Sequence, residues 1–159
     1  MRKRVPTLLG VLSICLAATA SSVFAQETHW FAAYEGQSVS PGIARTDTQR
    51  FVEVGTVDTD GFSELRISIA GEFKEAIPRG GTIGAILIPD INPFTYLLQQ
   101  EGKIVFATEV NVPIGGQSGA IFYSEAVPSK VAFPAYKIYL YNDTTSAAGV
   151  NVYVYRVRL

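Results

Sequence analysis

The feature that most constrains the fold is a pair of β-rich runs near the C-terminal end of the chain. Residues 135–141 and 150–159 are dense in tyrosine, valine and other β-favouring residues recurring at period two, and residues 142–149 between them are turn-forming. This pattern predicts two antiparallel strands joined as a hairpin.

Further strands are predicted upstream of this hairpin. In residues 63–70, Leu65, Ile67 and Ile69 share one face, and charged or polar side chains take the other. This alternation predicts a half-buried antiparallel strand. Residues 82–88 carry no polar alternation after Thr82, so we expect a central strand that is covered on both faces.

The whole pattern gives about eight strands separated by Gly, Pro, Asn and Asp, with no amphipathic helix among them. Residues 94–99 are too short to distinguish a strand from a short turn of helix. The prediction is therefore an all-β fold without substantial helix, namely a two-sheet antiparallel β-sandwich of jelly-roll-like or immunoglobulin-like type. We place this sandwich at residues 50–159 and interpret residues 26–49 as an N-terminal arm that Trp30 and Phe31 anchor.

Residues 1–25 have the pattern of a secretory signal peptide. A basic start is followed by the apolar residues 5–20 and by a cleavage site with small residues at positions −3 and −1, ending at Ala25. The prediction is a bacterial protein that is secreted or periplasmic after cleavage. A lipid anchor on Cys15 is the alternative, but the bulky residue before this cysteine disfavours it.

Cleavage there removes three basic residues and the only cysteine. The remaining chain carries 10 basic and 14 acidic residues, a net charge of −4, and has no disulfide. This charge does not favour nucleic acid or an anionic membrane surface as a partner. No later segment is apolar over the ~20 residues that a membrane span needs, so we expect no membrane insertion.

Two segments resemble the strands of small exported bacterial jelly-roll domains. These are residues 57–69 and residues 136–155, and the best-known domains of this shape are galactose-binding-like and carbohydrate-binding modules. The resemblance implies a binding module, and it brings no ligand-binding residue with it.

The inventory of reactive residues argues against an enzyme. His29 is the only histidine and lies close to the expected start of the mature chain, so neither a histidine-based catalytic group nor a histidine-rich metal site is expected. Paired carboxylates for glycosidic chemistry remain an alternative. Asp58 and Asp60, followed by Gly61, match the start of a calcium loop, but a turn explains the same residues. We expect no cofactor and no metal.

The tyrosines of the predicted hairpin are the candidate ligand-binding residues. An in-register hairpin with Leu140 opposite Val152 would place Tyr139 opposite Tyr153 on one face, and Tyr141 and Tyr155 would lie on that face too. A flat aromatic platform of this kind suits sugar rings or another surface, whereas cross-strand packing beneath the arm is the structural alternative.

Two function classes follow from these predictions. The first is a secreted, non-catalytic binding module for a glycan or another extracellular surface. The alternative is a structural or assembly protein of the cell exterior, in which Trp30, Phe31 and a sheet edge make protein–protein contacts.

Overall fold

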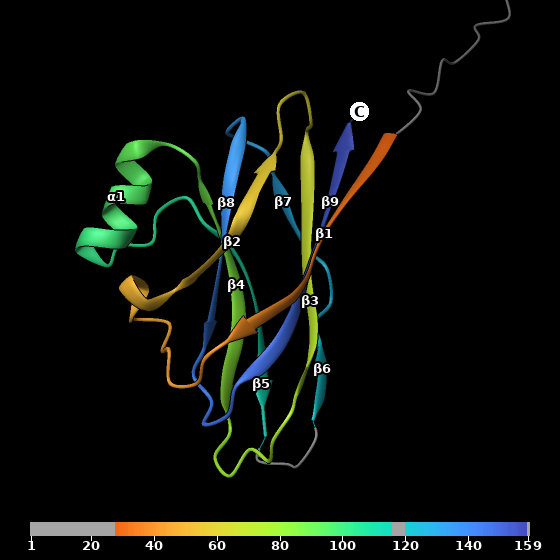
Figure 1. Cartoon of the computed structure of the whole chain (residues 1–159). Helices are drawn as coiled ribbons and strands as arrows, with labels where there is room; N and C mark the ends of the chain where they lie inside the picture. The colour runs from red at the N-terminus through yellow and green to blue at the C-terminus, as the bar shows by residue number, and fades with distance from the viewer. Residues whose placement is uncertain (1–27, 116–119, 159) are drawn as a thin grey trace, which may run out of the picture.

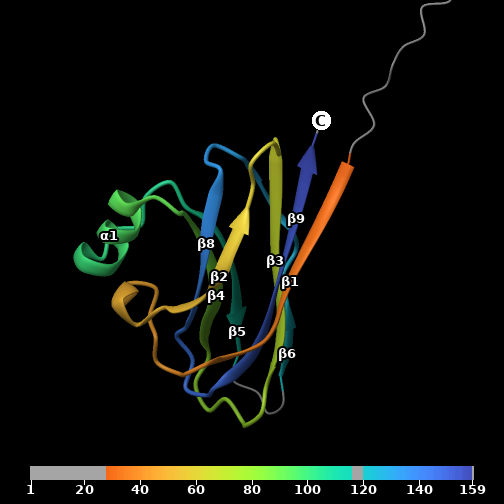
Figure 2. The same ribbon diagram turned by 45° about the horizontal axis from the view of Figure 1, so that its top comes forward.

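The computed structural model describes residues 28–115 and 120–158. It is a β-sandwich of two antiparallel sheets with one short helix, which confirms the predicted fold class (Figures 1 and 2). The described part contains nine strands: β1 Thr28–Val39, β2 Val52–Asp58, β3 Glu64–Phe73, β4 Gly81–Pro89, β5 Thr108–Ile114, β6 Ile121–Tyr123, β7 Val127–Lys130, β8 Ala135–Asn142 and β9 Ala148–Arg158. A 3-10 turn, η1, spans Thr48–Arg50, and the helix, α1, spans Asn92–Glu101.

The order of the strands defines a jelly roll. The five-stranded sheet has the order β1-β9-β3-β6, with β7 also paired to β3, and the four-stranded sheet has the order β2-β8-β4-β5. β6 and β7 pair with successive parts of β3 and together fill one edge position. The chain therefore fills eight strand positions in two sheets and changes sheet at every connection except that between β4 and β5, as in jelly-roll proteins.

The hairpin predicted at the C-terminal end is wrong, although both of its strands exist. β8 pairs with β2 and β4 in the four-stranded sheet, and β9 pairs with β1 and β3 in the five-stranded sheet. Residues 143–147 thus cross from one sheet to the other instead of closing a two-strand turn. Because strand period is local and strand partnership is not, a polar connection of this length suits either arrangement.

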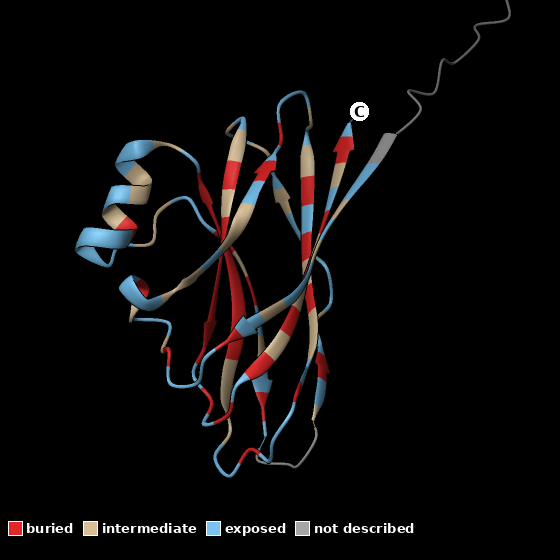
Figure 3. Cartoon of the chain, in the orientation of Figure 1, coloured by how far each residue is buried: buried red, intermediate tan, exposed pale blue. Residues whose placement is uncertain are grey.

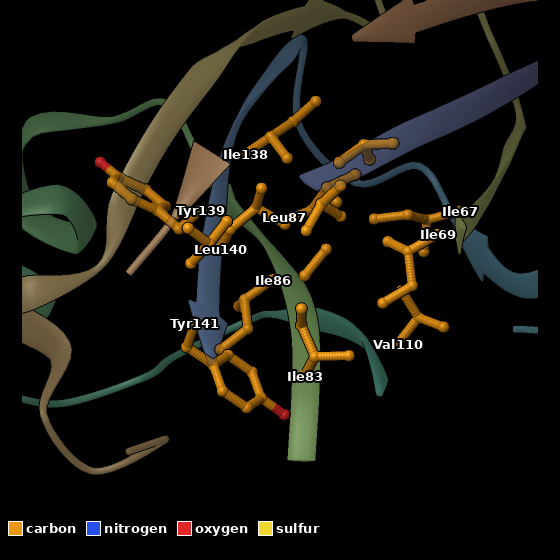
Figure 4. Close-up of a cluster of buried hydrophobic side chains, with 14 of the residues drawn as sticks. Ile67, Ile69, Ile83, Ile86, Leu87, Val110, Ile138, Tyr139, Leu140 and Tyr141 are labelled. Atoms are coloured by element: carbon orange, nitrogen blue, oxygen red, sulfur yellow. The ribbon is translucent and has the colours of Figure 1, made fainter. Parts of the chain in front are cut away.

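The core lies between the two sheets. Leu65, Ile67 and Ile69 of β3 are almost fully buried, which confirms the predicted phase of that strand. Every residue from Ile83 to Pro89 of β4 is buried, as expected for a central strand with both faces covered (Figure 3). The side chains of Ile138 and Leu140 meet these residues from β8 (Figure 4). Burial of this apolar surface is the main term that stabilises the sandwich.

The segment interpreted as an N-terminal arm contains a sheet strand. β1 pairs with β9 in ten residue pairs, with one register shift between Tyr34 and Gln37, so residues 28–39 belong to the five-stranded sheet. The remainder of the segment crosses to the other sheet, where Ile43 bridges to Asn142. The predicted signal peptide lies outside the described residues.

Residues 94–99, for which the sequence allowed either a strand or a turn of helix, are part of the helix α1. Residues 92–101 form the helix, with Pro93 in its first turn and Gly102 in a left-handed conformation at its C-terminal end. Proline at the start and glycine just past the end are typical helix boundaries. α1 and η1 lie on the outer side of the four-stranded sheet in both views (Figures 1 and 2).

Candidate functional site

The structure separates the four candidate tyrosines into two pairs, because β8 and β9 belong to different sheets. Tyr139 and Tyr141 project from the outer side of β8 and are only 3% and 1% exposed. η1 and α1 cover this side, and the Thr48 hydroxyl ties the two together by donating to the Leu98 carbonyl at 2.8 Å. The predicted platform that would include Tyr139 and Tyr141 is therefore wrong.

Both buried hydroxyls are hydrogen-bonded to carboxylates. Tyr139 donates to Glu53 at 3.3 Å, and Tyr141 donates to Glu109 at 2.8 Å. Burial, together with the negative charge of Glu53, raises the pKa of Tyr139 to about 12. Burial and the bond to Glu109 also raise the pKa of Tyr141. These tyrosines stabilise the structure beneath η1 and α1 as neutral hydrogen-bond donors.

Glu109 is the centre of a charged network on the same side. Arg45 donates to both of its carboxylate oxygens, with the shortest contact 2.7 Å long. Burial alone would raise the pKa of Glu109, but the hydrogen bonds from Arg45 and Tyr141 outweigh it and hold the pKa below its usual value. The segment between β1 and β2 is thus fixed to β5 by an ion pair.

Tyr153 and Tyr155 have a different environment, on the outer face of the five-stranded sheet. The Phe31 ring of β1 stacks on Tyr153 at 5.9 Å and contacts Tyr155 at 4.9 Å between ring centroids. Phe31 is 54% exposed and Tyr155 is 42% exposed. No described element covers this face in either view (Figures 1 and 2). The three rings form an aromatic ridge that is open to solvent.

A shallow groove accompanies this ridge along β3. A hollow of about 380 Å³ lies between Arg66, Ser68 and Tyr155, and another of about 460 Å³ lies by Ala70, Glu72 and Asn151. Ile121 and Tyr123 of β6 project on the far side of β3 and are the most exposed large apolar side chains that the structure describes. Small side chains such as Ser68 and Ala70 lie in these hollows beside the larger Tyr155 and Ile121.

β1 is the free edge of the five-stranded sheet. Its only sheet partner among the described strands is β9, so about half of its backbone N–H and C=O groups point away from the sheet. The run Thr28–Tyr34 contains no Lys, Arg, Asp, Glu or Pro. The opposite edge differs, because β6 is only three residues long and β7 carries Pro128 and Lys130. Short strands, proline and lysine are the usual means of blunting an edge, and this run of β1 lacks them.

Trp30 projects from the opposite side of β1, at the rim of the sandwich. Its ring meets Phe62 edge-on at 6.3 Å, and Trp30 is 52% exposed. The guanidinium groups of Arg156 and Arg158 lie 5.0 and 4.9 Å from the centre of the Phe62 ring, and each donates a hydrogen bond to a carbonyl of the turn between β2 and β3. Arg156 has the phase of the inward-facing residues Val152 and Val154 of β9, but it lies at the rim of the sandwich, where its guanidinium group reaches the Asp58 carbonyl.

The same end of the sandwich carries a second aromatic cluster. Phe106 contacts Phe94 of α1 and Phe133 at 5.1 and 5.9 Å, yet it is 68% exposed. It also has φ +52°, which is rare for a residue with a side chain and costs about 1–2 kcal/mol. The local sequence pattern gives no signal for this conformation, because the residues around Phe106 alternate as in a regular strand.

The turn at residues 58–61 accounts for the calcium-like pattern. The Asp60 backbone N–H donates to the Asp58 carboxylate at 2.9 Å, and Gly61 adopts φ +74°. Within residues 28–115 and 120–158, no group of three or more histidine, cysteine or acidic side chains is placed to hold a metal ion. In that same part of the chain, no helix is long and apolar enough to cross a membrane.

Neither the protein-family models nor the curated proteins give a match to this chain. Its fold is similar to solved viral and bacterial structures. The VP2 subviral particle of infectious bursal disease virus shares 9% identity at a TM-score of 0.49, with 84% of this chain and 33% of that chain covered. The structure of the Gx strain of this virus shares 9% identity at a TM-score of 0.47, with 84% of this chain and 32% of that chain covered.

A third similar structure is that of the Bacillus endospore appendages, described as disulfide-linked pili. It shares 11% identity at a TM-score of 0.35, with 94% of this chain and 99% of that chain covered. The present chain spans about a third of the length of the bursal disease virus proteins.

Proposed function

We propose that this chain is a non-catalytic structural protein that assembles with a neighbouring protein through the free edge of β1. The observation that carries the proposal is the run Thr28–Tyr34, an uncharged edge with Trp30 and Phe31 both more than half exposed. An unprotected edge is a template for pairing with another strand. The signal-peptide pattern of residues 1–25 supports assembly outside the cytoplasm.

Two features make this edge suitable for a specific contact. Consecutive residues of a strand point to opposite sides, so Trp30 and Phe31 flank the edge on both sides. Each ring is already held, Trp30 by Phe62 and Phe31 by Tyr153 and Tyr155. Because aromatic residues fixed by their neighbours lose little entropy on binding, they are effective anchors of protein interfaces.

A lysine on the edge tests the proposal. The change Ala33→Lys places a charge on an exposed position of β1, which disfavours strand addition. Sedimentation velocity should show a concentration-dependent mass for the natural chain and a monomer for Ala33→Lys. Ser40→Lys, at an exposed position just past β1, is the matched control and should assemble normally. A natural chain that stays monomeric, alone and with extracellular extract, would contradict the proposal.

A second candidate function rests on the groove of the five-stranded sheet. Tyr155 lines the hollow by Ser68, and Tyr123 of β6 stands opposite Ala70, which lines the other hollow together with Asn151 and Glu72. Aromatic margins with polar groups on the floor suit the rings and hydroxyls of an uncharged glycan. Tyr153 and Tyr155 are the ligand-binding residues of the original four that this candidate retains.

A panel of neutral polysaccharides tests this candidate. Binding in affinity electrophoresis should weaken several-fold in Tyr155→Ala and in Tyr123→Ala, because each lost aromatic contact is worth about 0.5–1.5 kcal/mol. Tyr96→Ala, which removes an exposed tyrosine from α1, should leave the binding unchanged. Retarded migration that is equal in all three variants would argue against the groove.

A further inference from the structure

We infer that the partner at the β1 edge is a second copy of this chain, paired antiparallel about a two-fold axis that passes beside Ala32. This inference rests on the proposed assembly through β1 and adds the identity and register of the partner. The pairing joins two five-stranded sheets into one continuous sheet across the dimer.

The argument begins from the sizes of the side chains on the two sides of β1. On the outer side, the bulky Phe31 is followed by the small Ala33, and on the inner side Ala32 lies between Trp30 and Tyr34. In an antiparallel pair, residues directly opposite share a side of the sheet and stand with their Cβ atoms about 4.5–5.5 Å apart. A two-fold axis at Ala32 therefore sets Phe31 opposite the partner's Ala33 and Trp30 opposite the partner's Tyr34.

This register matches a bulky residue with a small one on the outer side, twice by symmetry. The Phe31 ring has room over the partner's Ala33 and keeps its own contacts with Tyr153 and Tyr155. On the inner side, Trp30 gains an aromatic neighbour, a favoured cross-strand pair.

The neighbouring two-fold registers fit less well. An axis at Phe31 sets the two bulky Phe31 rings directly opposite each other and sets Trp30 opposite the partner's Ala32, so the aromatic pair of Trp30 with Tyr34 is lost. An axis at Ala33 sets Phe31 opposite the partner's Glu35, next to the register shift of β1. The charge of Glu35 and the turn-like Gly36, with φ +66°, end the pairing just past Tyr34. Only an axis at Ala32 pairs the whole run from Trp30 to Tyr34 with its copy.

Single cysteines test the register in the full chain. In a Cys15→Ser background no other thiol is present. Ala32→Cys places two thiols beside the axis, with the Cα atoms about 4.5–5.5 Å apart, inside the range of a disulfide. Ala33→Cys and Ser38→Cys are the matched controls. The Ala33 positions stand roughly 8 Å apart in this register, beyond disulfide reach, and Ser38 lies outside the pairing.

Mild oxidation followed by non-reducing electrophoresis should give a covalent dimer from Ala32→Cys, at least ten-fold faster than from either control. Faster cross-linking of Ala33→Cys would overturn the register. A dimer in sedimentation that none of the three cysteines captures would overturn β1–β1 pairing. Two further results distinguish a failure of the two-fold dimer from a failure of the proposed function. If no cysteine variant cross-links but Ala33→Lys still abolishes assembly, the β1 edge is used with an unlike partner. If the natural chain does not assemble at all, both the dimer and the proposed function are contradicted.

Discussion

The ring of Tyr141 lies directly over Gly84 of the neighbouring strand. A Cβ atom built on Gly84 would stand 2.5 Å from the Tyr141 hydroxyl oxygen, and the two residues are paired between β8 and β4. The glycine thus provides the space in which the tyrosine reaches Glu109, and the segment before β2 closes over both.

This relationship predicts a strong effect of one methyl group. Gly84→Ala should lower the free energy of unfolding by about 1–3 kcal/mol, because Tyr141 must leave its position or strain the sheet. Gly149→Ala is the control, since the nearest atom to its added Cβ is 3.9 Å away. That variant should change stability by no more than about 1 kcal/mol. Denaturant titration of both variants measures the difference, and equal losses would refute the role of Gly84.

The ion pair between Arg45 and Glu109 predicts a pH dependence on the acid side. The folded-state pKa of Glu109 lies below its ordinary value of 4.5, so the pair stabilises the protein fully above that pH. This contribution should be lost as pH falls through the lowered pKa, where the unfolded chain has already taken up its proton. In Arg45→Gln, the slope of unfolding free energy against pH should decrease below about 4.5. An unchanged slope would show that Arg45 does not lower this pKa.

Burial predicts opposite outcomes for two tyrosines that the sequence grouped together. Tyr139→Ala should cost about 3–5 kcal/mol, as truncation of a buried aromatic residue does. Tyr155→Ala, on the open face, should cost about 1 kcal/mol or less. The melting temperatures of the two variants provide the comparison. A drop as large for Tyr155 as for Tyr139 would mean that the outer face of the five-stranded sheet is covered.

Tyr139 also predicts a loss of stability on the alkaline side. Its folded-state pKa of about 12 exceeds the ordinary value of 10.0, so its contribution is complete below pH 10 and falls as pH rises toward 12. Absorbance titration of tyrosinate should show late ionisation of Tyr139 and Tyr141 in the natural chain, and the amplitude of this late phase should fall in Tyr139→Phe, where only Tyr141 contributes to it. An unchanged late amplitude in that variant would show that Tyr139 does not ionise late.

Phe106 predicts an effect of backbone strain. Phe106→Gly should be more stable than Phe106→Ala by about 1 kcal/mol, because only glycine adopts φ +52° without cost. Both variants lose the same contacts with Phe94 and Phe133, so their difference isolates the backbone. Thermal unfolding measures it, and a more stable alanine variant would contradict the conformation of this residue.

The sequence by itself determined the local features of this protein. Alternation in residues 63–70 fixed which side of β3 faces the core, and the continuous apolar run at residues 82–88 identified a strand covered on both sides. These patterns report burial directly, since a strand presents successive side chains to opposite faces. The count and spacing of such strands, with little helix, were enough to define a two-sheet sandwich.

Only the tertiary structure decided which strands are partners, and with them the position of the site. Tyr139 and Tyr153 lie in consecutive strands with the same aromatic alternation, yet β8 and β9 enter different sheets. Tyr139 is buried because α1 and η1, distant in sequence, cover its side, and Tyr155 is exposed because no described element covers the other sheet. The physical reason is that period two specifies a face but not what lies against it, and that choice depends on packing between distant segments.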